Sequence, residues 1–200
     1  MAASCSGQYP RSGYHITRIG SPVQFDKYRV ALRNLLQLCV NPDPVNSSIG
    51  FRAPLADVEA ESYWKSLSAK LDVTPITVHL FVLSATQSSA DVLATVQIFT
   101  IPKITHRHRA EIAKLLVHPS ARRKGIATIL MDFVEEFARD ELGTEMLTLD
   151  TASETPAMAF YERSGWKQWG TCPEYAEYAD GRRCDATFFH KFIRRPSAPV

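Results

Sequence analysis

Hydrophobic and polar positions alternate along this chain with two different periods, one near two residues and one near 3.6. The first period predicts strands and the second predicts helices. Together they predict the order β, α, α, β, β, β, α, β, α, β, β. The corresponding segments are residues 14–20, 21–40, 57–71, 76–85, 91–102, 110–117, 126–140, 145–151, 155–164, 166–170 and 185–193.

Polar residues and prolines mark the limits of these elements. Ser21 and Pro22 stand where a helix cap and a first helical residue are expected. The polar segment 86–90 separates two apolar, β-branched runs, which predicts an antiparallel hairpin. Residues 1–12 and 194–200 have no apolar period and are expected to be loose tails, leaving one domain over residues 13–193.

Composition narrows the function classes. The 200 residues, 45% of them hydrophobic, suit one globular domain. Because 23 basic residues oppose 21 acidic ones, the charge favours neither nucleic acid nor an anionic membrane as partner. No apolar run reaches the roughly 20 residues of a membrane helix, and residues 1–13 lack a secretory pattern. Four cysteines without a CxxC pair indicate reduced thiols, no metal site and a cytoplasmic location.

A basic, glycine-containing turn, "ARRKG", precedes the helix predicted at residues 126–140. Exposed N–H groups at a helix N-terminus attract anions, and Gly125 lets the main chain approach a ligand closely. Ala127 adds little bulk, Thr128 adds a hydroxyl, and residues 122–124 add positive charge. The turn therefore favours a diphosphate ligand. A solvated helix entry is the alternative, and the spacing matches neither a P-loop nor a dinucleotide fingerprint.

The segment "LLVHPSARRKGIA" resembles the acetyl-CoA signature (Q/R)-x-x-G-x-(G/A) of the GNAT family of N-acetyltransferases, with Arg122, Gly125 and Ala127 at its positions. A second block, "LTLDTASETPAMAFYERSGW", follows in the order typical of that family. Within the family, residues 110–192 are most similar to the tabtoxin resistance acetyltransferases, which inactivate a β-lactam amino acid. The first hundred residues match mainly in the order of elements.

The resemblance implies an α/β fold with a mixed, mainly antiparallel sheet, splayed between residues 111–117 and 145–151 and flanked by helices. Acetyl-CoA would lie in the splay, and no metal would be required. Glu154 occupies a position where many relatives have an Asn that contacts the cofactor, so it is not assigned to the site. Main-chain groups would hold the pantetheine arm at Leu115, Leu116 and Val117, and the pyrophosphate at Arg122, Arg123, Lys124, Gly125, Ile126, Ala127 and Thr128.

Two acidic residues are candidates for the base of the reaction. Acetyl transfer needs a neutral amine, and an alkylammonium is only about 0.1% neutral at pH 7. Glu111 lies in an apolar strand and Asp150 closes another, where carboxylates are costly unless they are used or paired. Glu111 could instead pair with a nearby Arg or Lys, and Asp150 could cap a turn. The resemblance implies that both act as a water-linked base.

Tyr161 is the candidate acid. Its position beside Phe160 in an amphipathic helix is also typical of a core aromatic residue. The resemblance implies that its hydroxyl contacts the thioester sulfur and protonates the leaving thiolate.

The long, turn-rich loop 41–56 is the candidate acceptor region, with Phe51 and Arg52 as substrate-binding residues. Because this loop could cover a small pocket, we expect a small-molecule amine as acceptor, for example an amino-acid-like toxin or metabolite. A peptide or protein acceptor, or a non-catalytic CoA sensor, are the alternatives. The oligomeric state stays open, with a homodimer as one alternative.

Overall fold

The computed structural model describes residues 7–11, 13–43, 48–86 and 92–194. These residues form one sheet with the strand order β1-β2-β3-β4-β5-β6-β8-β7, in which only the β5–β6 pair is parallel. The strands are β1 (Gln8–Arg11), β2 (Tyr14–Ile19), β3 (Val78–Ser84), β4 (Val92–Thr100), β5 (Arg109–Val117), β6 (Met146–Ala152), β7 (Lys167–Glu177) and β8 (Arg183–Phe192). The α-helices are α1 (Pro22–Val40), α2 (Asp57–Ser68), α3 (Ile126–Asp140) and α4 (Ala157–Arg163).

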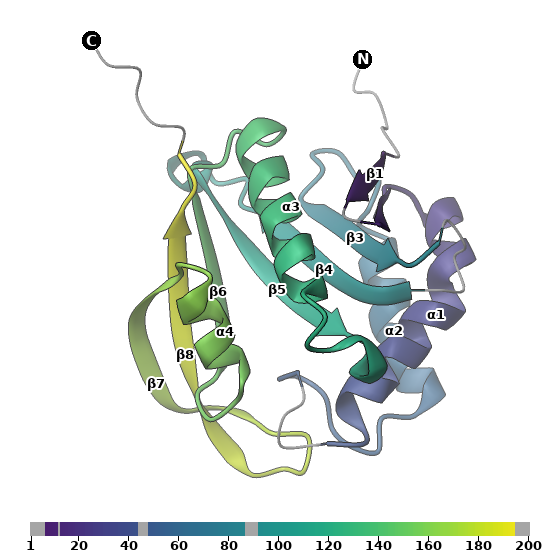
Figure 1. Ribbon diagram of the computed structural model, residues 1–200, viewed down its shortest axis with the longest axis vertical. Helices are drawn as coiled ribbons and strands as arrows, with labels where there is room; N and C mark the ends of the chain where they lie inside the picture. The colour runs from purple at the N-terminus through teal and green to yellow at the C-terminus, as the bar shows by residue number, and fades with distance from the viewer. Residues whose placement is uncertain (1–6, 12, 44–47, 87–91, 195–200) are drawn as a thin grey trace.

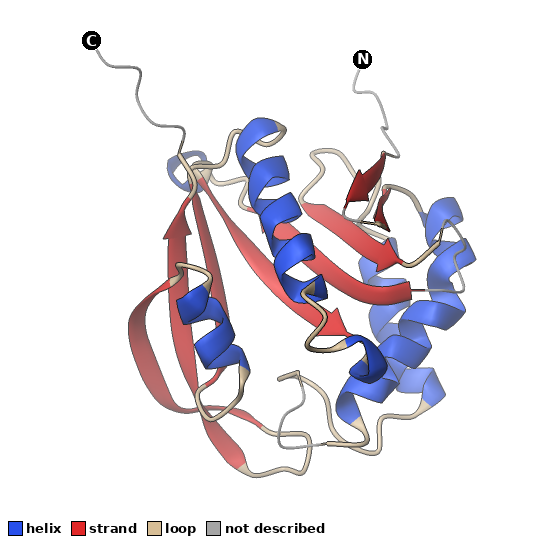
Figure 2. Cartoon of the chain, viewed as in Figure 1, coloured by secondary structure: helices blue, strands red, loops and turns tan. Residues whose placement is uncertain are grey.

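Helices cover both faces of the sheet (Figures 1 and 2). The pair α1 and α2 packs on one face of the N-terminal strands, and α3 and α4 lie on the opposite face. Strand β3 is buried on both sides, because Leu80 and Val82 join the α1–α2 core while Phe81 and Leu83 join the α3 core. A strand covered on both faces reads as a continuous apolar run, as this one does.

Local signals place the helices where the sequence predicts them. The Ser21 side chain accepts a hydrogen bond from the N–H of Gln24 at 3.3 Å, and Pro22 is the first residue of α1. Helix α3 turns an apolar stripe toward the sheet, where its two aromatic side chains, Phe133 and Phe137, pack against Phe81. This packing fixes the direction of the turn that enters α3.

The sheet opens between β5 and β6, as the family resemblance implies. These strands pair only where residues 109–111 meet residues 146–148. Beyond that point β5 stays paired with β4, and β6 stays paired with β8. The edges of β5 and β6 that face each other therefore separate. A β-bulge in β5 bends this strand further away from β6. Lys114, in the bulge, has a φ of +50°. The splay is therefore open beside residues 112–117.

The sequence prediction is wrong in two places. Residues 8–11, expected in a loose tail, form β1, because main-chain pairing with β2 needs no apolar period. Tyr9 packs against Phe133 at a ring-centroid distance of 4.8 Å, and Arg11 pairs with Glu136. Strand β7 continues to Glu177, seven residues past its predicted end, as an exposed edge strand. The outer parts of the predicted tails, residues 1–6 and 195–200, lie outside the described residues.

Candidate active site

The turn before α3 presents main-chain N–H groups without side-chain competition. Gly125 is the N-cap residue with a φ of +76°, and no side chain caps the helix. A Cβ built on Gly125 would have no atom within 4 Å, so the space in front of the turn is open. The left-handed backbone explains the glycine. The turn can therefore receive an anion at its N–H groups.

The three basic residues of this turn are exposed but differ in their contacts. Arg122 folds back, and its Nε donates to the carbonyl of Val117 at 3.3 Å. Arg123 and Lys124 have no ion pair with any described residue. Two cationic groups thus remain available beside the open N-terminus of α3.

The predicted pantetheine strand, residues 115–117, lies at the end of β5. Leu116 and Val117 are paired with Thr95 and Ala94 of β4, so the other edge of the strand faces the splay. The carbonyl of Val117 also accepts from the Cys39 thiol at 3.5 Å, which ties this strand to α1. The strand edge that faces the splay has no partner strand among the described residues, so its main chain can pair with an extended ligand.

The two candidate acids come together where β5 and β6 separate. Glu111 is the Cα partner of Thr148, and Asp150 lies two residues farther along β6 on the same face. Desolvation raises the pKa of Glu111, and the charge of Asp150 raises it further. Desolvation also raises the pKa of Asp150, while the charge of Lys114 opposes the shift. The two carboxylates are thus electrostatically coupled.

Basic side chains act on both acids from a distance, because the charges of Arg109 and Lys114 lower the pKa of Glu111 and the charge of Lys114 lowers the pKa of Asp150. No Lys, Arg or His among the described residues forms an ion pair with Glu111 or Asp150. Helix α4 begins after Pro156 without a side-chain cap, so Asp150 is not its cap. Both residues keep exposed surface, although partial burial of their carboxylates raises the two pKa values.

Tyr161 lies in α4, 8% exposed, with its ring against Trp166 and Phe189. It is therefore part of the core, as the structural alternative expects. Desolvation raises the pKa of its hydroxyl, and the nearby charge of Asp150 raises it further. The phenol stays protonated and lies within electrostatic reach of Asp150.

Lys114 is a site residue that the sequence suggested only as an ion-pair partner. Its Nζ donates to the carbonyl of Ile49 at 2.6 Å and lies 5.0 Å from the centroid of the Phe51 ring. Burial lowers the pKa of Lys114, whereas the charges of Asp150 and Glu111 raise it. The bulged lysine therefore joins the acceptor loop to the acid pair. A lysine within "AEIAKLLV" is the only signal of this role in the sequence.

Phe51 and Arg52, the predicted acceptor residues, have different surroundings. Phe51 packs edge-on against Tyr63 with ring centroids 5.0 Å apart, beside Lys114. Arg52 is exposed and forms an ion pair with Glu177, at the end of β7. The N–H of Ala53 donates to the carbonyl of Ala179 at 2.9 Å. The loop is thus fastened to the β7–β8 turn, and its residues 44–47 lie outside the described part.

Comparison with known proteins identifies the family and the fold. A model of the acetyltransferase (GNAT) family matches residues 52–166, more than half of the chain. The spermidine N-acetyltransferase of Vibrio cholerae, solved with CoA and spermine, has 20% identity and a TM-score of 0.65 over 89% of this chain and 95% of that one. The ribosomal-protein-S5-alanine acetyltransferase of Vibrio fischeri has 12% identity and a TM-score of 0.73 over 94% and 97%. At these identities the likeness shows the fold.

The described part of the chain shows neither a metal-binding cluster nor a membrane-spanning helix. No group of three or more His, Cys, Asp and Glu side chains there could hold a metal ion. No helix in the same residues is long and apolar enough to cross a membrane.

Proposed function

The chain belongs to the acetyltransferase (GNAT) family, and on that premise we propose that it transfers the acetyl group of acetyl-CoA to the primary amine of a small molecule. The observation that carries the proposal is the coupled acid pair Glu111 and Asp150 at the mouth of the splay, with Tyr161 within electrostatic reach. We assign this activity to the single domain predicted over residues 13–193, to which strand β1 adds residues 8–11.

The chain has groups that fit acetyl-CoA, whose thioester supplies the activated acetyl group. The uncapped N–H groups of residues 125–128 would hold the pyrophosphate, with charge from Arg123 and Lys124. The free edge of residues 115–117 would pair with the amides of the pantetheine arm. The open space in front of Gly125 supports this fit, because no atom of the described residues lies within 4 Å of a Cβ built there.

The acid pair would remove the proton of the acceptor ammonium. Bringing an amine of pKa near 10 to its neutral form at pH 7 costs about 4 kcal/mol. The raised pKa of Glu111 makes it a stronger base than an ordinary carboxylate, and Asp150 can share the proton directly or through water. Tyr161, still protonated, would donate a proton to the leaving thiolate.

A small acceptor is supported by the contacts of the loop at residues 48–53. The Arg52–Glu177 ion pair and the Ala53–Ala179 hydrogen bond fasten this loop across the acceptor side. An amino-acid-like toxin or metabolite is the class we propose, in keeping with the resemblance to the tabtoxin resistance enzymes. The described cysteines, Cys39, Cys172 and Cys184, are free thiols, which supports our placing the enzyme in the cytoplasm.

A thiol-release assay with acetyl-CoA tests the proposal. The acceptor panel should contain amino acids, amino sugars, polyamines and short peptides, each with the wild type and the Glu111→Gln/Asp150→Asn double variant. We expect turnover with at least one small amine and a large loss in the double variant. Turnover with peptides alone would favour a protein acceptor. Tight CoA binding without any turnover would make the chain a sensor and overturn the proposal.

A further inference from the structure

Aromatic side chains gather on one face of β7 and β8. Trp169, Tyr175 and Phe192 are each 55% exposed, and no other aromatic residue in the described part of the chain is exposed. Tyr175 lies edge-on to the half-buried Phe188, with ring centroids 5.1 Å apart. The half-buried His190 stacks on Trp169 at 6.0 Å and contacts Phe192 at 5.6 Å. We call these five residues the aromatic strip.

The aromatic strip shares a face of the sheet with the acid pair. Asp150 is the Cα partner of Phe188, and two residues earlier Thr148 is the partner of His190. Because side chains that are paired in this way point to the same face, Asp150 and Phe188 are direct neighbours. Phe189, between the two strip residues of β8, joins the α3 core on the opposite face. The strip therefore begins beside the acid pair.

Helices α1 and α2 leave this part of the sheet uncovered (Figure 1). Apart from Ala179, every buried residue in the core of these two helices precedes β6 in the sequence. The acceptor loop reaches the face only at its far end, where Ile49 packs against Ala152 and Cys184. The loop thus meets this face beyond Asp150 and leaves the aromatic strip open.

A β-bulge in β7 keeps space above Phe188. Gln168 and Gly170 pair with the adjacent residues 189 and 188 of β8, so Trp169 is the extra residue of the bulge. Trp169 stacks on His190, whereas Gly170, the partner of Phe188, has no side chain. A Cβ built on Gly170 would meet no atom within 4 Å. A flat group can therefore lie beside Phe188 without displacing a described side chain.

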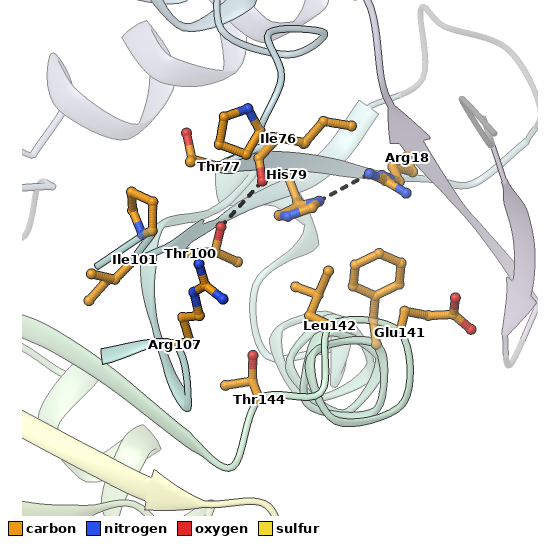
Figure 3. A pocket seen from close by; sticks show the side chains of 13 residues that line it. Arg18, Ile76, Thr77, His79, Thr100, Ile101, Arg107, Glu141, Leu142 and Thr144 are labelled. Carbon is orange, nitrogen blue, oxygen red and sulfur yellow. Dashed lines mark hydrogen bonds between the residues drawn. The ribbon is translucent and has the colours of Figure 1, made fainter. Parts of the chain in front are cut away.

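The cavity in Figure 3 does not offer another place for the acceptor. It has a volume of about 470 Å³ and lies between one end of β3 and β4 and the C-terminal end of α3. In its wall, Nη2 of Arg18 lies 3.1 Å from Nδ1 of the buried His79 (Figure 3). Because arginine only donates, Nδ1 accepts this hydrogen bond. Neither Glu111 nor Asp150 lines the cavity, so an amine bound there would not reach the acid pair.

We propose that the aromatic strip selects the acceptor, which is a primary amine joined to an aromatic ring by a short chain. This inference rests on the proposed function and names the substrate class of that site. The ammonium would lie at the acid pair, and the ring would lie against Phe188 and the rings beside it on β7. From β6 to β7 the sheet spans two strand spacings, about 10 Å, which an arylalkylamine can bridge.

The chemistry of this face favours such an amine over a second copy of the chain. Aromatic rings attract both a cation and another ring, and the adjacent carboxylates attract the ammonium. A second copy seated on the strip would also cover Glu111 and Asp150, and burial of unpaired carboxylates is costly. An aliphatic amine would use the acid pair but leave the exposed rings in water.

Titration calorimetry with the CoA-saturated protein tests the inference without requiring turnover. Phenethylamine is compared with propylamine, and phenylalanine with alanine. We expect the aromatic member of each pair to bind about tenfold more tightly. Equal affinities in both pairs would overturn the inference, and turnover of an aliphatic amine in the thiol-release assay would still support the proposed function. Tight binding of the aromatic amines without any turnover would overturn the proposed function alone.

Trp169→Ala and Tyr175→Ala locate the site, because both side chains are exposed and their loss should leave the fold intact. We expect each to reduce the preference for phenethylamine over propylamine several-fold. Val23→Ala is the control, since Val23 is an exposed apolar residue at the start of α1, the end remote from the acceptor loop. An unchanged preference in both strip variants, or an equal reduction in Val23→Ala, would contradict the inference. A wild-type dimer that Trp169→Ala dissociates in sedimentation would make the strip an interface between copies instead.

Discussion

Glu111 and Asp150 are the residues on which the proposed proton path depends. Glu111→Gln keeps the shape of the side chain but removes the base, so kcat/KM should fall about 10²- to 10⁴-fold at neutral pH. Part of the activity should return as the pH rises and the amine deprotonates itself. Asp150→Asn should lower kcat/KM in the same way. Because the two charges are coupled, the double variant should lose less activity than the product of the two single losses.

Pre-steady-state rates with a saturating amine provide the measurement. Glu145→Gln is the control, since Glu145 is an exposed carboxylate that pairs with Arg194 just before β6. Full activity of Glu111→Gln at neutral pH would remove Glu111 from the mechanism.

The activity lost when Tyr161 is replaced should not return as the pH rises. Tyr161→Phe keeps the packing against Trp166 and Phe189 and removes only the donor, so raising the pH should not restore the lost rate. A pH–rate profile of the variant checks this, with Tyr28→Phe as a buried control in α1. Recovery in alkali equal to that of Glu111→Gln would contradict an acid role.

His79 should make stability depend on pH. Burial, and then the charge of Arg18, lower the pKa of His79 to about 4 from 6.5. The unfolded chain takes up this proton below pH 6.5, while the folded chain resists it until about pH 4. Stability is therefore lost as the pH falls through that window, by about 3 kcal/mol at most.

Urea unfolding at pH 7 and pH 4.5 measures this loss. His79→Gln, whose amide oxygen can still accept from Arg18, should lose about 2–3 kcal/mol less than the wild type between the two conditions. The exposed His108→Gln should change as the wild type does. Equal losses in all three proteins would show that His79 is not the group that titrates.

Residues of the site differ in how far the sequence could predict them. The basic glycine turn was recognisable because a local motif encodes it, and the structure places Gly125 with the left-handed backbone that such a turn needs. The role of Lys114 could not be recognised in the sequence, because it depends on a bulge and on contact with a loop residue 65 positions away. The roles of Glu111, Asp150 and Tyr161 stay predictions, although the charge of Asp150 acts on both Glu111 and Tyr161 in the structure.

At the scale of elements, the turn into α3 yields a comparison between two glycines. Gly125 and Gly143 lie at opposite ends of α3 with φ of +76° and +65°, and a Cβ on either would meet no atom within 4 Å. Valine should therefore strain both turns similarly. Only Gly125→Val should also obstruct the pyrophosphate, so it should weaken acetyl-CoA binding at least tenfold, about 1.4 kcal/mol.

Titration calorimetry with acetyl-CoA on both folded variants gives the result. Wild-type affinity in Gly125→Val, or equal weakening in Gly143→Val, would contradict a close main-chain approach at Gly125.

Most elements could be predicted from the sequence, because apolar residues recur with a clear period wherever one side of an element is buried. Strand β1 and the second half of β7 could not, since main-chain hydrogen bonds hold them at the edges of the sheet. Nearly all residues of β7 are exposed, so no apolar period reveals its second half as a strand. Edges of sheets are where the pattern of side chains carries least information.

At the scale of the whole molecule, the Arg52–Glu177 ion pair joins the loop between α1 and α2 to the end of β7. If its role is to fasten the acceptor loop, Arg52→Gln and Glu177→Gln should raise the KM of the amine by the same factor, with little change in the KM of acetyl-CoA. If Arg52 instead binds a substrate carboxylate, only Arg52→Gln should raise the KM of the amine, and Glu177→Gln should leave it unchanged.

Steady-state kinetics of both variants and of the double variant decide between these roles. Arg183→Gln is the control, because Arg183 forms an exposed ion pair with Glu174 in the same hairpin. A change in both KM values would indicate general damage to the fold.

The bulge at Lys114 has a consequence for how the chain avoids aggregation. Strands β1 to β5 precede β6 in the sequence, so during synthesis β5 is a bare sheet edge that could recruit a strand from another molecule. The bulge interrupts the regular register of that edge, and Glu111 and Lys114 place opposite charges along it. A foreign strand would have to bury both charges to pair there. The bulge that leaves room for a ligand in the folded enzyme is thus expected to protect the incomplete chain against aggregation during synthesis.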